Sequence, residues 1–391
     1  MTAVALDPVG AARALAADLA AGALEVERAR RLPPALVTRL RAAGLFTLGL
    51  PRSLGGLESP AGQIIDAVEA VARADASVGW AVLIGNTSAF LAWLDPAVAK
   101  TFTAGPTGTV LAGSMAPSAR GEVVDGGAAY RVTGRWAFAS GCTHADVVMG
   151  GFVVTEDGVP GRTAHGAPLL RVAFLRADQV EVHDTWRVAG LAGTGSHDIS
   201  VADVVVPAEH TAVPFAERSV EPGALYRLTP YTVLMVLFAG FPLGVAGRAL
   251  DELESLAGTK RRVGSGRPLI EDPGVATAVV ADRAALDAAG LLVRDRAERV
   301  WARVAAGGEP TPAERADLAS ATLHAFDVGR EVVSRCFTAA GASALAEDAP
   351  LQRCLRDLHA AGQHIAFSAD SRIRVARTRL GLVVPPAMFA V

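Results

Sequence analysis

Cysteine is scarce in this chain, and its placement argues against two kinds of protein. The 391 residues include three cysteines, Cys142, Cys336 and Cys354, which are odd in number and far apart. Such positions form neither a disulfide framework nor the paired spacing of a metal site. We therefore expect neither structural disulfides nor a bound metal.

Charge of one sign and long apolar runs are scarce as well. The formal net charge is -3, which provides no basic field for nucleic acid or anionic lipid. The longest apolar stretch, from Leu234 to Ala246, is interrupted by glycines and by Pro242, and is shorter than the roughly 20 residues of a membrane span. The first residues show no basic-then-apolar export signal. With 51% hydrophobic and 20% charged residues, we expect a globular, cytoplasmic protein.

Two kinds of pattern follow one another in the first half of the chain. From Pro8 to about Asp95, apolar residues recur at helical spacing. Between Val110 and Val206, short β-branched runs are separated by Gly, Pro and Asp, which predicts a small antiparallel β unit, a barrel or a sandwich. These runs do not alternate with crossover helices, which argues against a dinucleotide-binding α/β fold.

Helical patterns return after about Tyr226 and predict a four-helix bundle. Pro350 marks the start of the last helix. The predicted fold class is therefore α+β with mostly helix: an N-terminal helical domain, a central antiparallel β domain and a C-terminal bundle. The four bundle helices are predicted near 231–257, 272–306, 312–342 and 351–380, and the domains at 1–106, 107–218 and 219–391.

One motif of the β region combines aromatic side chains with a hydroxyl. Trp136, Phe138 and Ser140 stand at alternate positions, and Gly141 follows. A serine hydroxyl both donates and accepts hydrogen bonds, so it suits a ligand that changes protonation. Taken alone, the motif also fits a strand with a buried Trp that ends in a Ser-Gly turn.

A second motif, from Asp184 to Asp198, is rich in glycine and carries the hydroxyls of Thr194 and Ser196. Its small residues let backbone approach a ligand closely. It lacks the final glycine and the following helix of a dinucleotide fingerprint, and it is not a nucleophile elbow. A tight β turn is the alternative interpretation.

Two histidines near the C-terminus form the third motif. His359 and His364 are five residues apart, which places them about 140° apart around a helix and excludes a shared metal-binding face. One can point inward while the other meets solvent. A pKa of about 6.5 lets a histidine exchange protons near neutrality. We interpret Arg353, Arg356 and Asp357 as ion-pairing residues of the bundle.

Two further segments carry polar residues that could reach a ligand. The stretch 260–273 between bundle helices contains Arg261, Arg262 and Arg267, whose guanidinium groups fit phosphate oxygens. A solvated loop is the alternative. A helix predicted from Ala76 to Trp93 carries Asn86.

Together these motifs resemble the acyl-CoA dehydrogenase superfamily, in its reduced-flavin, oxygen-using monooxygenase branch, over nearly the whole chain. The resemblance implies that Ser140 binds near flavin N5. It also selects His364 as the inward histidine, acting as a base or as a hydrogen-bond partner of the substrate. The other site residues that it implies are Trp136, Phe138, Gly141, Thr194 and Ser196 beside the flavin, Arg262 at its phosphate, often from a neighbouring subunit, and Asn86 at the substrate cavity.

The activity implied by the resemblance is a two-component flavin monooxygenase. A separate reductase would supply FADH2 or FMNH2, and O2 would form a flavin hydroperoxide that oxygenates a small organic substrate. We expect an aromatic or heteroaromatic substrate, because a histidine activates phenols and indoles readily. The resemblance also implies a homotetramer and a role in secondary metabolism.

Two other functions remain open at this point. An acyl-CoA dehydrogenase or related desaturase would need a carboxylate facing the flavin, but the nearest acids, Glu347 and Asp348, fall in the loop before the last helix. A flavin-free binding protein is the second alternative. The joint presence of Trp136, Ser140 and His364 argues against it.

Overall fold

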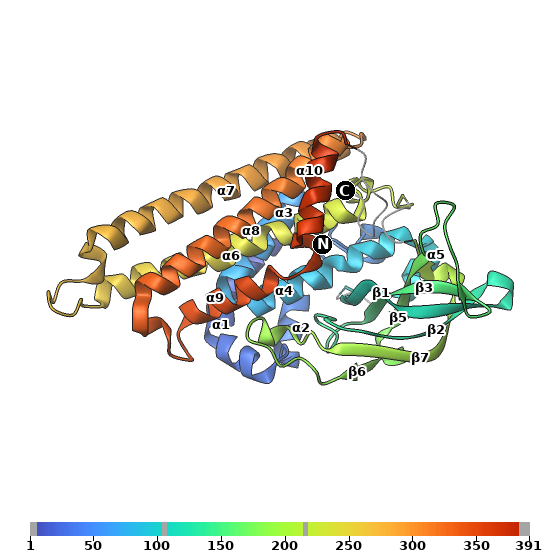
Figure 1. Ribbon diagram of the computed structural model, residues 1–391, viewed down its shortest axis with the longest axis horizontal. Helices are drawn as coiled ribbons and strands as arrows, with labels where there is room; N and C mark the ends of the chain where they lie inside the picture. The colour runs from blue at the N-terminus through green and yellow to red at the C-terminus, as the bar shows by residue number, and fades with distance from the viewer. Residues whose placement is uncertain (1–5, 104–107, 214–217, 383–391) are drawn as a thin grey trace, which may run out of the picture.

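The N-terminal helices begin near the prolines and capping residues that predict them. The structure is a computed structural model that describes residues 6–103, 108–213 and 218–382 (Figure 1). Asp7 caps the first helix by accepting a hydrogen bond from the backbone N–H of Gly10 at 3.0 Å. The helices of this part are α1 (Pro8–Ala29), α2 (Pro34–Ala42), α3 (Ala61–Ala74), α4 (Ala76–Gly85) and α5 (Pro96–Thr101). The helix predicted from Ala76 to Trp93 ends at Gly85, and residues 86–93 continue as a 3-10 helix.

The central region forms one mixed sheet in the order β6-β7-β2-β1-β3-β5-β8, with β4 paired to β3. Its strands are β1 (Leu111–Val124), β2 (Ala129–Trp136), β3 (Val147–Glu156), β4 (Val159–Pro160), β5 (Leu170–Arg176), β6 (Glu181–His183), β7 (Asp198–Pro207) and β8 (Thr211–Ala212). The prediction of an antiparallel unit is correct for every strand pair except β1 and β3, which are parallel. The reason is topological. Strands β2 and β3 lie on opposite sides of β1, so the connection 137–146 between them crosses β1. This connection carries Ser140.

The C-terminal part is a bundle of long helices that packs beside the sheet (Figure 1). Its helices are α6 (Pro230–Thr259), α7 (Pro273–Ala305), α8 (Pro312–Ala340), α9 (Pro350–Ala361) and α10 (Ala369–Arg379). The central helix α6 is buried on nearly all sides and packs against α3 and α8. The predicted domain limit at 106/107 lies outside the described residues.

The last predicted helix, 351–380, is wrong in one respect that matters for the site. Helix α9 ends at Ala361, and α10 begins only after Ser368, whose side chain accepts a hydrogen bond from Ser371 N–H. His364 lies in the break and caps the 3-10 turn Ile365–Phe367. The two histidines therefore do not share a helix, and the angle between them around one helix does not apply.

Two helical stretches, Ala76–Trp93 and Pro230–Thr259, are long and apolar enough to cross a membrane by length and composition alone. Of their most apolar windows, 89% and 94% is buried inside the protein. Core helices of a folded protein have the same properties, so these stretches are weak evidence for a span.

Candidate active site

A cavity of about 1010 Å³ lies where the sheet meets the helices. Its wall includes residues of α4, β1, β3, the connection after β2, the segment 186–191, α6, α9 and the break between α9 and α10. Most of the lining is apolar or aromatic, including Trp80, Met115, Met149, Leu234 and Phe238. A concave, largely apolar site with a few polar groups is the usual form of a small-molecule site.

Ser140 lies on the lining and begins a row of buried hydroxyls. Its Oγ accepts a hydrogen bond from Trp80 Nε1 at 3.1 Å and lies 2.7 Å from Ser196 Oγ. Ser196 Oγ lies 2.6 Å from Thr194 Oγ1, which donates to the carbonyl of Leu191 at 2.7 Å. The two motifs that the sequence singled out in the β region are therefore joined at the cavity wall.

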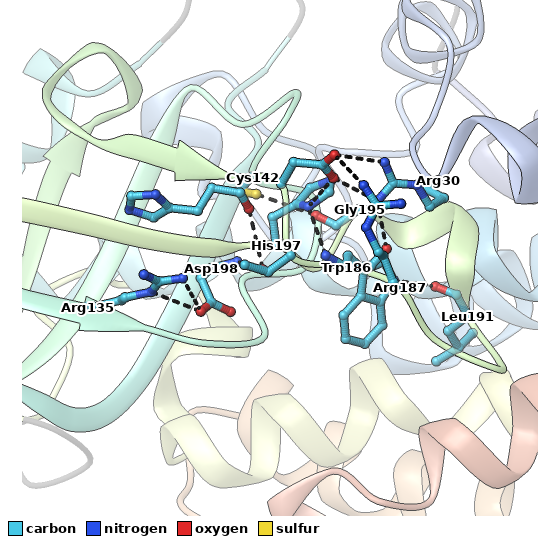
Figure 2. A network of polar contacts seen from close by, with 12 residues as sticks. Arg30, Arg135, Cys142, Trp186, Arg187, Leu191, Gly195, His197 and Asp198 are labelled. Carbon is cyan, nitrogen blue, oxygen red and sulfur yellow. Dashed lines mark hydrogen bonds and ion pairs between the residues drawn. The ribbon is translucent and has the colours of Figure 1, made fainter.

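Hydrogen bonds of the Arg30 guanidinium, the His197 imidazole and the Trp186 indole hold the segment 184–198 in place (Figure 2). Arg30 donates two hydrogen bonds to Asp184, at 2.7 and 3.0 Å. The backbone N–H of Trp186 donates to His197 Nδ1 at 3.2 Å, and Trp186 Nε1 donates to the carbonyl of Leu191 at 3.0 Å. Trp186 lines the cavity, so these contacts fix one of its aromatic walls.

Leu191 adopts a left-handed backbone conformation, with φ of 55°. Its N–H donates to Asp357 Oδ1 on α9 at 2.6 Å, and Asp357 is only 2% exposed. Burial raises the pKa of Asp357 to about 7, and it raises the pKa of Asp75, the N-cap of α4, to about 6. The interpretation of Asp357 as an ion-pairing residue is wrong, because its described hydrogen-bond partner is a backbone amide. Sequence patterns do not predict a hydrogen bond between two residues that are 166 positions apart in the chain.

The prediction that Arg356 and Arg353 form ion pairs is confirmed, although their partner is on α1. Arg356 approaches Glu27 at 2.6 Å and Arg353 approaches the same carboxylate at 3.7 Å. Arg356 also donates to Gln352 at 2.6 Å and to the carbonyl of Ala189. Although it lies on the cavity lining, its guanidinium is already engaged.

His364 lies on the lining, in the break between α9 and α10. Its Nδ1 accepts a hydrogen bond from the backbone N–H of Ala366 at 3.2 Å. The ring lies among aromatic neighbours, with centroid distances of 5.0 Å to Phe238 and 5.8 Å to Trp80. Burial lowers the pKa of His364 to about 4, so the ring is neutral at pH 7. His359 also borders the cavity, but it is exposed and contacts Ser334 Oγ at 3.1 Å.

Phe138 presents an aromatic ring that protein atoms leave largely uncovered. It lines the cavity, is 72% exposed and adopts φ of 65°, which is uncommon for a bulky residue. Its ring meets Trp186 edge-on at a centroid distance of 6.1 Å. Strain of this kind is often kept at ligand sites.

Two predicted flavin contacts lie elsewhere in the structure. Trp136 is 1% exposed, donates from Nε1 to the carbonyl of Gly151 at 2.7 Å, and belongs to the sheet core rather than to the cavity wall. Gly141, at φ of 79°, forms the turn after Ser140, and its N–H donates to the carbonyl of Thr194 at 3.0 Å. Trp80 and Trp186 supply the indole walls instead.

The prediction that Asn86 lies at the substrate cavity is wrong. It is fully buried, and its amide binds three backbone groups: the N–H of Gly49 at 3.1 Å and the carbonyls of Leu45 and Val82 at 2.7 and 2.8 Å. All of the described hydrogen bonds of Asn86 are thus made to backbone groups of the fold. Its neighbour Thr87 lies on the cavity lining. Thr194 is fully buried behind Ser196 rather than on the lining.

Arg262 lies in the loop between α6 and α7, where it is ion-paired with Asp272. This loop is at the end of the bundle away from the sheet (Figure 1). A contact between Arg262 and a flavin phosphate within one chain is therefore not supported. A contact from a neighbouring subunit stays a prediction.

Carboxylates are missing from the cavity wall within the described residues. Glu347 and Asp348 are exposed in the loop before α9, as the sequence predicts. The desaturase alternative, which requires an acid facing the ligand, therefore has no support from this wall.

Two family models match the chain. Residues 9–95 match the acyl-CoA dehydrogenase N-terminal domain, and residues 236–369 match the acyl-CoA dehydrogenase C-terminal domain. An indole-3-acetate monooxygenase of Pseudomonas putida is 32% identical over 350 residues, which cover 88% of this chain and 86% of that protein. The oxygenase component of an FADH(2)-dependent resorcinol hydroxylase from Rhizobium sp. (strain MTP-10005) is 30% identical, covering 96% and 94%. The crystal structure of the HsaA monooxygenase from M. tuberculosis matches with a TM-score of 0.88 at 28% identity, covering 99% and 100%.

The chain therefore belongs to the acyl-CoA dehydrogenase superfamily, as its motifs predict. Within that superfamily it is a flavin-dependent monooxygenase, the oxygenase component of a two-component system. The family, the fold and the enzyme class expected from the sequence are confirmed.

Proposed function

We propose that the cavity beside Ser140 and His364 binds reduced flavin from a separate reductase together with a small aromatic substrate, and that one atom of O2 is inserted into that substrate. In the overall reaction, reduced flavin, O2 and substrate give oxidised flavin, water and the oxygenated product. Flavin supplies the two electrons when it is bound. The protein contributes binding, orientation and exclusion of water.

The volume of the cavity, its aromatic surfaces and the Ser140 hydroxyl support the binding of a flavin. Its volume of about 1010 Å³ is at the upper end of the range for small-molecule sites, which suits two ligands at once. The uncovered ring of Phe138 and the indole of Trp186 offer flat apolar surfaces to a ring system. Ser140 offers a hydroxyl oxygen at the same wall, in keeping with a contact to flavin N5.

His364 would contact the substrate as a hydrogen-bond donor. Because Nδ1 accepts from Ala366 N–H, it carries no proton, and the proton of the neutral ring is assigned to Nε2. An Nε2–H facing the cavity donates to a phenolate or carbonyl oxygen. Of the two roles expected from the sequence, base and hydrogen-bond partner, this geometry favours the partner.

Finer assignments of location, assembly and substrate belong to the same proposal, and the homotetramer rests on the resemblance alone. We place the enzyme in the cytoplasm and expect a homotetramer built through the bundle, which would let Arg262 of one subunit approach the flavin phosphate of another. FMN and FAD both remain open as the flavin. An aromatic substrate is supported by the aromatic lining and by relatives named for indole-3-acetate and resorcinol.

The experiment that tests this function supplies the chain with a flavin reductase, NADH, FMN or FAD, and a panel of phenols, indoles and aromatic acids under ¹⁸O2. We expect one labelled oxygen atom in the product of at least one aromatic substrate. Hydrogen peroxide alone with every member of the panel, or product without label, would contradict the proposal. A thioester substrate that reduces bound flavin without O2 would restore the desaturase alternative.

A further inference from the structure

We infer that Thr194 and Ser196 are positioning residues that fix the proton of the Ser140 hydroxyl, so that Ser140 faces the cavity only as a hydrogen-bond acceptor. This arrangement selects reduced flavin over oxidised flavin. The inference rests on the proposed function, because it requires flavin N5 to meet Ser140.

The direction of every hydroxyl in the row follows from its two ends. The carbonyl of Leu191 can only accept, so Thr194 Oγ1–H donates to it at 2.7 Å. With that proton committed, the 2.6 Å contact between Thr194 and Ser196 requires Ser196 Oγ–H to be the donor. By the same reasoning, Ser140 Oγ–H donates to Ser196 at 2.7 Å.

Trp80 fixes the other end of the row. Its Nε1–H can only donate, and it donates to Ser140 Oγ at 3.1 Å. A hydroxyl oxygen has two lone pairs. One lone pair of Ser140 Oγ accepts the hydrogen bond from Trp80, and the hydroxyl proton is donated to Ser196. The second lone pair is left to accept a hydrogen bond from a ligand in the cavity that Ser140 lines.

The carbonyl at the end of the row is itself held in place. Leu191 is fixed by Asp357 through its N–H at 2.6 Å, and Trp186 Nε1 donates to the same carbonyl as Thr194 does. Thr194 is fully buried, and Ser196, which borders the cavity, is 3% exposed, so bulk solvent does not compete for their protons. The direction of each hydrogen bond in the row is therefore fixed, as are the positions of its oxygen atoms.

The consequence follows from the chemistry of flavin N5. Reduced flavin carries N5–H, a donor that matches the free lone pair of Ser140. Oxidised flavin instead carries a lone pair at N5. This lone pair would face the lone pair of Ser140 and repel it, unless Ser140 gives up its hydrogen bond to Ser196 and turns its proton toward the flavin. Since a net hydrogen bond is worth about 1 kcal/mol and 1.4 kcal/mol is tenfold in affinity, the row should contribute about a fivefold to tenfold preference for reduced flavin.

Anaerobic titrations with FMN and FAD, each in oxidised and dithionite-reduced form, measure this preference as the ratio of the two dissociation constants. In Thr194→Val, Ser196 loses its acceptor and can turn its proton toward Ser140, which can then donate to the cavity. We expect the ratio to fall by about fivefold to tenfold. Thr194→Ser keeps the hydroxyl and should keep the ratio of the wild type.

The midpoint potential of bound flavin measures the same preference by a second method, and a purely structural role would not move it. Tighter binding of the reduced form raises the potential, and a tenfold change in the ratio corresponds to about 30 mV for a two-electron couple. Thr322→Val is the matched control. Thr322 is also fully buried and donates to a backbone carbonyl, of Leu318 at 3.2 Å, but it lies on α8 away from the cavity lining.

The control should lose stability without a change in the ratio or the potential. If folded Thr194→Val keeps the wild-type ratio, the row does not orient Ser140 and the inference is wrong. Should Thr194→Val fail to fold, Ser196→Ala takes its place with the same expected loss. Binding of neither redox state by the wild type is a different result, and it would remove the proposed flavin site itself.

Discussion

Asp357 on α9 and Leu191 in the segment before β7 are joined by a hydrogen bond of 2.6 Å from the backbone N–H of Leu191 to Oδ1. This contact connects the bundle to the wall of the cavity. It holds Leu191 in its left-handed conformation, and the carbonyl of Leu191 ends the row of hydroxyls that reaches Ser140. A buried acid of the bundle that is not on the cavity lining thus supports the cavity wall.

The stability of the fold should depend on pH because of this acid. Burial raises the pKa of Asp357 from 3.8 to about 7, so the folded chain binds more protons than the unfolded chain between about pH 4 and pH 7. Stability from this group is present below pH 4 and is lost as the pH rises through 7. In Asp357→Asn the amide oxygen can still accept from Leu191. We expect this variant to be more stable than the wild type at pH 8, by on the order of 2 to 4 kcal/mol.

Urea unfolding at pH 5 and pH 8 measures the effect. The gain in Asp357→Asn should be much smaller at pH 5, where the wild-type carboxyl is mostly protonated. Asp357→Leu, which cannot accept from Leu191, should be destabilised at both values. An equal change in stability for Asp357→Asn at the two pH values would show that Asp357 does not titrate as described.

The role of His364 is tested by replacing it with a side chain that donates but does not act as a base. His364→Gln keeps an N–H donor, whereas His364→Ala keeps none. We expect His364→Gln to retain a substantial part of the coupling of flavin oxidation to product, and His364→Ala to lose about tenfold and form hydrogen peroxide instead. Equal losses in both variants would favour the base.

The pH profile gives a second test of the same residue. With its pKa lowered to about 4, His364 stays neutral from pH 5 upward and charges only in more acidic solution. The product-forming rate should therefore show no inflection near pH 6.5 that disappears in His364→Gln. An inflection of that kind would mean that the ring titrates as an exposed imidazole does.

Asn86 should contribute to stability and not to ligand binding. Asn86→Ala removes three hydrogen bonds and leaves buried backbone groups of Gly49, Leu45 and Val82 without their partner. We expect a loss of about 2–4 kcal/mol in the free energy of unfolding, with the flavin affinity of the folded protein unchanged. A change in flavin affinity with unchanged stability would return Asn86 to the site.

The segments of the site could be predicted from the sequence, but the direction of several side chains could not. The Trp-x-Phe-x-Ser pattern marks the connection after β2, and regular alternation would put Trp136, Phe138 and Ser140 on one face. Positive φ at Phe138 ends that alternation. Trp136 therefore packs into the sheet core, while Phe138 and Ser140 line the cavity.

The break after α9 shows a second limit. Apolar spacing favours one helix through 351–380. Gly362 is the C-cap of α9, but a single glycine inside a helical pattern is tolerated and does not by itself mark a helix end. Ser368 is a helix cap, but a serine within a helical pattern is an ambiguous signal. The family motif selects His364, which lies on the cavity lining, whereas helical geometry gives no choice between it and His359.

The binding of reduced flavin at Ser140 is the claim on which the other assignments depend. Anaerobic equilibrium titration of the wild type and of Ser140→Ala with reduced FMN and reduced FAD tests it directly, with Asn86→Ala as a control for general loss of stability. We predict saturable binding of one reduced flavin per chain by the wild type, and binding about fivefold to tenfold weaker in Ser140→Ala. No saturable binding by the wild type, or equal affinity in Ser140→Ala, would contradict this account.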